Sequence, residues 1–312
     1  MRRLPVAIVS AAFLCAPSTR AAAPLSLTEG RISLQVSADT GTILSLADVA
    51  SGITLAAPPE LAESFRLALQ IPDQPPATII GKDQPLALHV SEAGSLKLEW
   101  GPRLRDTSGA EHDLTVRMAI TAADGRLTFT LHVDNRSAGK LTEARYPMLG
   151  GLTGLKAPGK ACDASLWVPT STPTEKSVTL PFGEVEYGYP GQMNMAFACI
   201  RGGSADRSLY FASEDPIARY KVYRFSEIGG DVFASVVHVP QTPPGGVFDG
   251  SPVAARFVDG DWRGAGKVYR EWFIRAFGLA DPRRDWIRRE SFFVFTMFML
   301  PEGTINMRFR DI

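Results

Sequence analysis

The sequence has few of the residues that hold metal ions. Its 312 residues include 3 cysteines and 4 histidines. The histidines are scattered, and no cysteine has metal-ligand spacing to another cysteine or to a histidine, which argues against a zinc site. We therefore expect no metal and no cofactor. The four histidines are His89, His112, His132 and His238.

Excess charge and long apolar segments are also missing. Lysine plus arginine number 33, as do aspartate plus glutamate, so the formal net charge is zero. Without a basic run or an aromatic RNA-binding signature, nucleic acid is not an expected partner. The longest apolar stretches, residues 4–16 and 291–300, are too short to span a membrane as helices.

The N-terminus has the pattern of an export signal. Arg2 and Arg3 precede the apolar residues 4–16, and the small residues 21–23 follow as a cleavage site. This pattern predicts a signal peptide over residues 1–23 and a secreted or periplasmic protein. The alternative is an apolar first strand. After cleavage Cys162 and Cys199 remain, either as a disulfide or as two buried thiols.

Residues 24–258 show the signals of many short strands. Residues 32–36 alternate apolar and polar side chains, residues 38–41 form a turn, and Asp124-Gly125 is typical of a hairpin turn. Because strands are dense and helices few, we expect a mainly β fold, a large antiparallel β-supersandwich. Further strands are expected at 42–46, 53–55, 95–100, 114–120, 127–133, 195–200, 209–212, 218–225, 232–239 and 253–257.

The pattern changes after residue 258. Apolar side chains at helical spacing predict a linker helix within 259–290, with Asp261 as its N-cap and Gly278 at its end. The nearly continuous apolar run 291–300 suits a strand buried on both faces, as in parallel sheets. Since parallel partners need crossover connections, we expect residues 291–312 to be the truncated start of a second, missing domain.

Several short motifs, in this order, resemble secreted bacterial glycoside hydrolases of the α-galactosidase-like type. The resemblance implies an N-terminal supersandwich of the galactose-mutarotase type, a connecting helix and a (β/α)8 catalytic barrel, of which residues 291–300 would be the first strand. The motifs are residues 36–46, 134–136, 146–152, 189–195, 209–215, 260–262 and 269–272.

The resemblance also implies that catalysis is performed elsewhere. Such glycosidases use two carboxylates of the barrel, and these would lie beyond Ile312. We therefore name no catalytic residue and expect the chain alone to be inactive, with the downstream barrel and an oligosaccharide or polysaccharide as partners. The alternatives are a stand-alone carbohydrate-binding β-sandwich without catalysis and a structural envelope protein without a ligand.

Five residues are candidates for sugar contacts. Pyranose rings stack on aromatic side chains, while their hydroxyl groups need amide and carboxylate partners. Residues 182–194 supply such groups between glycines and prolines, so we expect a loop, and a further carboxylate follows a strand end. The opposing interpretation is that the tyrosines pack an interdomain seam. The candidates are Tyr187, Tyr189, Gln192, Asn194 and Asp215.

A mutarotase-type active site within the sandwich is a weaker hypothesis. It needs a histidine and a carboxylate converging on the sugar ring. His112 and His132 lie on neighbouring expected strands, with Glu111 or Glu143 as partners. Trp167 is expected in the core.

Overall fold

The computed structural model describes residues 22–154, 164–171, 174–202 and 207–278. The chain divides into two compact units, Met1–Trp272 and Phe273–Ile312. The expected signal peptide, Cys162 and the apolar run 291–300 fall wholly or largely outside the described residues. In the second unit, the rings of Phe273 and Phe277 pack with their centroids 4.5 Å apart.

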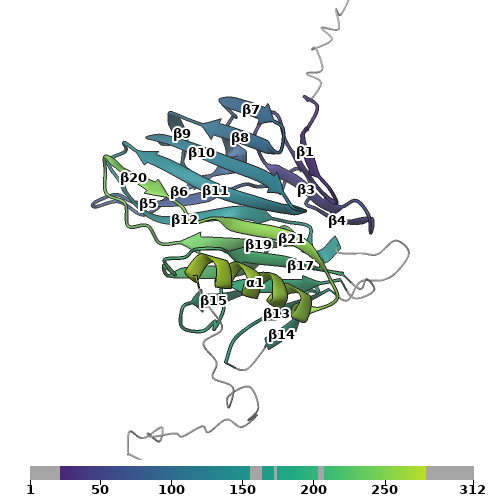
Figure 1. Cartoon of the computed structure of the whole chain (residues 1–312). Helices are drawn as coiled ribbons and strands as arrows, with labels where there is room; N and C mark the ends of the chain where they lie inside the picture. Colours follow the sequence, from purple (N-terminus) through teal and green to yellow (C-terminus); the bar gives the residue numbers. More distant parts are fainter. Residues whose placement is uncertain (1–21, 155–163, 172–173, 203–206, 279–312) are drawn as a thin grey trace, which may run out of the picture. The chain divides into compact units, whose positions relative to one another are not determined.

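The first unit is built from antiparallel sheets, as expected (Figure 1). The smallest has four strands in sequence order. Its β2 matches the expected strand, and Leu34 and Val36 are buried in it. The strands are β1 (Leu25–Glu29), β2 (Ile32–Val36), β3 (Ile43–Asp48) and β4 (Ile53–Ala56).

The largest sheet has eleven strands, with the path β14-β13-β16-β17-β21-β11-β10-β8-β7, while β20 pairs with β11 and β9 with β10. Alternate residues of β10 are buried, which gives this strand one apolar and one exposed face. The bounds are β7 (Leu88–Glu92), β8 (Ser95–Trp100), β9 (Arg103–Arg105), β10 (Glu111–Ala123), β11 (Arg126–Asn135), β13 (Ser165–Val168), β14 (Thr174–Ser177), β16 (Phe197–Arg201), β17 (Arg207–Ser213), β20 (Gly246–Asp249) and β21 (Val253–Asp259).

The third sheet has six strands in the order β15-β18-β19-β12-β5-β6. Every residue of β19 is buried. One continuous core contains apolar side chains from all three sheets, among them Leu34, Leu98 and Val236. The strands are β5 (Arg66–Gln70), β6 (Ala77–Ile80), β12 (Lys140–Leu149), β15 (Glu184–Tyr189), β18 (Lys221–Ile228) and β19 (Asp231–His238), and short 3-10 turns span Gly81–Asp83 and Leu152–Gly154.

Two turns expected from the sequence have the geometry their residues favour. Asp124 and Gly125, both with positive φ (55° and 69°), connect β10 to β11. Gly41, at φ 68°, ends the turn after β2. A Cβ at Gly41 would collide with the indole of Trp100, whose Nε1 donates to the Thr40 carbonyl at 2.8 Å. The glycine therefore allows both the turn and the burial of Trp100.

The helix expected near the C-terminus is α1 (Trp262–Phe277). Asp261 caps it by accepting a hydrogen bond from the backbone N–H of Arg263 at 2.9 Å, and Gly278 follows with φ 60°. The part of α1 up to Trp272 packs on β13 and β16 (Figure 1). Trp262 stacks on the buried Trp167 with ring centroids 4.7 Å apart.

Candidate functional site

Tyr187 and Tyr189 lie on strand β15, at one edge of the six-stranded sheet. The expectation of a loop is wrong here, because residues 184–189 pair with β18. Tyr187 and Tyr189 are partly buried and pack on the core together with Val185. These three residues alternate with Glu184, Glu186 and Gly188, which is the period of two typical of a strand. The flanking Gly and Pro residues suggested a loop instead.

Gln192 and Asn194 lie in the turn after β15, where the expected loop is correct. The side-chain oxygen of Gln192 accepts a hydrogen bond from the backbone N–H of Gly188 at 2.7 Å. The backbone N–H of Asn194 donates to the Pro169 carbonyl at 2.8 Å, while buried Met193 anchors the turn. Both amide side chains are exposed, so they remain accessible to a ligand at the edge of the sheet.

Asp215 follows the end of β17 and is buried. Its carboxylate accepts hydrogen bonds from the backbone N–H groups of Ile217 and Arg219, both at 3.1 Å, and from Lys221 Nζ at 2.8 Å. Burial alone would raise the pKa of Asp215, but Lys221 and the backbone donors outweigh it and hold the pKa below its ordinary value. The carboxylate therefore stays ionised and organises the turn.

Lys221, at the start of β18, is the residue that sequence reasoning missed. Its side chain is fully buried, and Nζ lies 5.9 Å from the centroid of the Tyr189 ring as well as beside Asp215. Burial lowers the pKa of Lys221, partly offset by Asp215. The sequence does contain a signal for the burial of Lys221. This lysine lies two and four residues before the core residues Tyr223 and Phe225, so a strand with period two places all three side chains on the same buried face.

Tyrosine hydroxyl groups extend this polar cluster beneath α1. The Tyr223 hydroxyl donates to the Ala196 carbonyl and accepts from the Ser213 backbone N–H. Tyr189 shares a side-chain hydrogen bond with Tyr269 of the helix. Burial raises the pKa of Tyr223 and Tyr269, so both phenols stay neutral.

The structure thus brings Tyr189 and Asp215 together through Lys221. It places Gln192 and Asn194 on the adjoining turn and Tyr187 two residues earlier on β15. Partly exposed aromatic rings beside exposed amide side chains suit a sugar ring and its hydroxyl groups.

The two strand histidines do not converge. On adjacent β10 and β11, His132 lies opposite Arg117, five residues along β10 from His112. His112 Nε2 lies 2.9 Å from an oxygen of Asp106, and His132 Nδ1 lies 2.7 Å from one of Asp249. Their carboxylate partners are therefore not Glu111 and Glu143, and the geometry that mutarotase-type catalysis needs from these histidines is missing.

Within the described residues, no group of three or more His, Cys, Asp and Glu side chains is arranged to hold a metal ion. No helix in the same part of the chain is long and apolar enough to cross a membrane. Within the described residues Cys199 forms no disulfide, and burial raises the pKa of its thiol to about 12. Cys162, the other cysteine of the expected pair, lies outside those residues.

Comparison with known proteins finds similarity at the level of structure alone. No family model and no curated protein matches the sequence. Among solved structures, a galactose mutarotase-like protein from Lactobacillus casei aligns with a TM-score of 0.52 and 11% identity, over 75% of this chain and 100% of that chain. The fold is that of the galactose mutarotase-like β-sandwiches.

Other solved structures share this fold. A putative aldose 1-epimerase from Escherichia coli K12 aligns with a TM-score of 0.50 and 16% identity, covering 76% of this chain and 99% of that one. The GH36 α-galactosidase AgaA from Geobacillus stearothermophilus gives a TM-score of 0.54 and 12% identity, over 80% of this chain but 42% of that chain. The chain thus corresponds to less than half of the α-galactosidase, its N-terminal domain.

Proposed function

We propose that this chain is the carbohydrate-associated N-terminal module of a secreted glycoside hydrolase. It shapes the substrate site of a downstream catalytic barrel and has no glycosidase activity alone. The observation that carries the proposal is the mutarotase-like fold: 80% of this chain aligns with an α-galactosidase, but the alignment covers only 42% of that enzyme. The aromatic and amide groups at the edge of the six-stranded sheet support it, because they suit a polyhydroxylated ligand.

A second candidate is a stand-alone carbohydrate-binding protein without catalysis. One observation favours it: the mutarotase-like protein from Lactobacillus casei is covered over 100% of its length by this chain, so the sandwich also occurs without a barrel. Sequencing the reading frame through and beyond Ile312 separates the two candidates. A following barrel with paired carboxylates supports the module, and a stop codon there supports the stand-alone protein.

In either case we place the sugar contacts on Tyr187, Tyr189, Gln192 and Asn194. The two rings offer partly exposed faces or edges, and the two amides offer donors and acceptors. Asp215 is a positioning residue, because its oxygens already accept hydrogen bonds from the turn and from Lys221.

Calorimetric titration of the purified chain with a panel of oligosaccharides tests this placement. Tyr189→Ala should weaken binding about three- to tenfold, the range expected for the loss of one aromatic contact, and Gln192→Ala should also weaken it. Tyr220→Ala is the matched control. Tyr220 is exposed and lies against Gly188. Because successive residues of a strand face opposite sides, Gly188 faces away from the side of β15 that carries Tyr187 and Tyr189. Equal affinity for all three variants and the wild type would contradict the assignment.

The proposed absence of catalysis and the proposed location have their own tests. The purified chain should release no aryl leaving group from a panel of aryl glycosides. Turnover that persists after repurification would contradict the proposal that the chain alone is inactive. Fractionation of the producing cells should place the protein in the periplasm or medium, with residues 1–23 removed. Recovery in the cytoplasm with an intact N-terminus would contradict secretion.

A further inference from the structure

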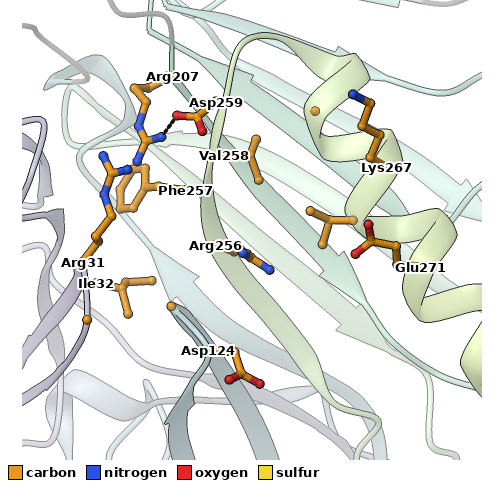
Figure 2. A pocket seen from close by; sticks show the side chains of 14 residues that line it. Arg31, Ile32, Asp124, Arg207, Arg256, Phe257, Val258, Asp259, Lys267 and Glu271 are labelled. Carbon is orange, nitrogen blue, oxygen red and sulfur yellow. Dashed lines mark hydrogen bonds and ion pairs between the residues drawn. The ribbon is translucent and has the colours of Figure 1, made fainter.

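The first unit has a second concave surface, and none of the five sugar-contact candidates lines it. This pocket has a volume of about 600 Å³, within the roughly 300–1,000 Å³ typical of small-molecule sites. Its walls come from the β1–β2 turn, the β10–β11 turn, the end of β21 and α1 (Figure 2). Elements from both ends of the sequence therefore build it.

Specific contacts hold these walls in place. The Gly125 backbone N–H donates to a carboxylate oxygen of Glu29 at 2.6 Å, which ties the β10–β11 turn to the first hairpin. A Cβ at Gly264 would collide with the Asp259 carbonyl oxygen, so glycine at this position lets α1 approach the end of β21. The pocket is thus formed by packed elements of the fold.

Two of the four cations in the pocket are already neutralised. Arg31 and Arg207 both bind the buried carboxylate of Asp48, at 3.2 and 2.6 Å, and Arg207 also contacts Asp259. Figure 2 shows the two guanidinium groups side by side at one end of the pocket, next to Phe257. This end is a closed ion-pair network.

The remaining charged groups are not paired in this way. In the part of the chain that the structure describes, Arg256, Lys267, Asp124 and Glu271 make no side-chain hydrogen bond or ion pair with protein. They come from three different walls, β21, α1 and the β10–β11 turn, and Figure 2 shows them around the open part of the pocket. Two are cations and two are anions.

We propose that this pocket is a second saccharide-binding site, for a short uncharged oligosaccharide. The inference rests on the proposed carbohydrate function. An anionic ligand would be attracted by Arg256 and Lys267 but repelled by Asp124 and Glu271, and a cationic ligand would meet the reverse. A sugar hydroxyl both donates and accepts, so neighbouring hydroxyl groups satisfy charges of both signs without a net charge on the ligand.

Calorimetry on the purified chain tests the site with short neutral gluco-, galacto- and manno-oligosaccharides, and with an oligogalacturonate of similar length as the anionic probe. Arg256→Ala should weaken binding of the neutral ligand at this site about tenfold or more, as expected for a lost hydrogen bond to a charged group. Glu271→Gln keeps a hydrogen-bonding group but removes the charge, so it should weaken binding less, by about threefold to tenfold. Glu271 is exposed and the Gln substitution preserves its shape, so this variant keeps the fold. Lys97→Ala is the control, since Lys97 and its partner Glu92 are both exposed on β7 and β8.

The outcomes separate this inference from the proposed function. One outcome would overturn the second site alone: the wild type binds a neutral ligand, Tyr189→Ala binds it more weakly, and both pocket variants bind it with full affinity. Tighter binding of oligogalacturonate, weakened by Arg256→Ala and strengthened by Glu271→Gln, would replace it by an anion site. Failure of every saccharide to bind the folded wild type would overturn both proposals.

Discussion

His238 ends strand β19 with its imidazole almost wholly removed from water. The ring stacks on Tyr146 with centroids 4.6 Å apart, and Nδ1 lies 3.5 Å from the Ser251 hydroxyl. Within the described residues, Nε2 has no hydrogen-bond partner. Lys221 lies directly opposite His238 on β18. Burial, followed by the Lys221 charge, lowers the pKa of His238 to about 3 from its ordinary 6.5.

This shift makes the protein less stable in acid. As the pH falls below about 6.5, the histidine of the unfolded chain takes up a proton, while His238 in the folded protein stays neutral until about pH 3. Protons therefore favour the unfolded state over this window. Between about pH 6.5 and pH 5, roughly 1.5 pH units, the free energy of unfolding falls by about 1.36 kcal/mol per unit. The total loss is about 2 kcal/mol. The pKa values of Asp48, Asp106 and Asp215 are lowered below 3.8, so their effects on stability fall at lower pH.

Urea unfolding followed by tryptophan fluorescence at about pH 7.5 and pH 5 measures this effect. His238→Phe preserves an aromatic ring against Tyr146 and cannot titrate, so its free energy of unfolding should lose about 2 kcal/mol less on acidification than that of the wild type. The control is His89→Gln, a substitution at an exposed histidine of β7 that keeps His238 in place. An identical loss in wild type and His238→Phe would refute the reasoning.

Three further predictions follow from buried groups. Asp215→Asn should lower the free energy of unfolding by about 3–5 kcal/mol, because it leaves the Lys221 charge buried without its partner. Adding Lys221→Met to this variant should recover much of the lost stability. If urea unfolding shows that Asp215→Asn costs less than about 1 kcal/mol, the buried ion pair is contradicted. The Cys199 thiol should react with a disulfide reagent only as fast as the protein unfolds, because the thiol is buried and its pKa is raised to about 12. Rapid labelling of Cys199 in the native protein, located by peptide mapping, would contradict this prediction. Trp262→Ala should expose the face of Trp167 on which Trp262 stacks and shift the fluorescence emission to the red, and an unchanged emission maximum would argue against this packing.

Periodic patterns predicted most of the fold. Residues 32–36 and 95–100 alternate cleanly and match β2 and β8, and Asp124-Gly125 connects β10 to β11 as expected. The helix was predictable because Asp261 caps it and Gly278 follows it. In each case the signal is local, and neighbouring residues alone determine the outcome.

The candidate site was harder to predict because its contacts are not local. Tyr189 reaches β18 and α1, and the partner of Asp215 is a lysine that sequence statistics place on the surface. The charged pocket between the hairpin turns, β21 and α1 joins residues more than 200 positions apart, from Arg31 to Glu271. Strand pairing across such separations is set by the global topology, which short sequence windows do not contain.

The most direct test of the proposed function is a glycan array probed with the purified, labelled chain. The proposal predicts retention on a defined subset of neutral glycans, abolished by an excess of the matching free sugar and weakened by Tyr189→Ala. A folded chain that is retained on no glycan at any protein concentration tested would contradict a carbohydrate-associated function for this sandwich.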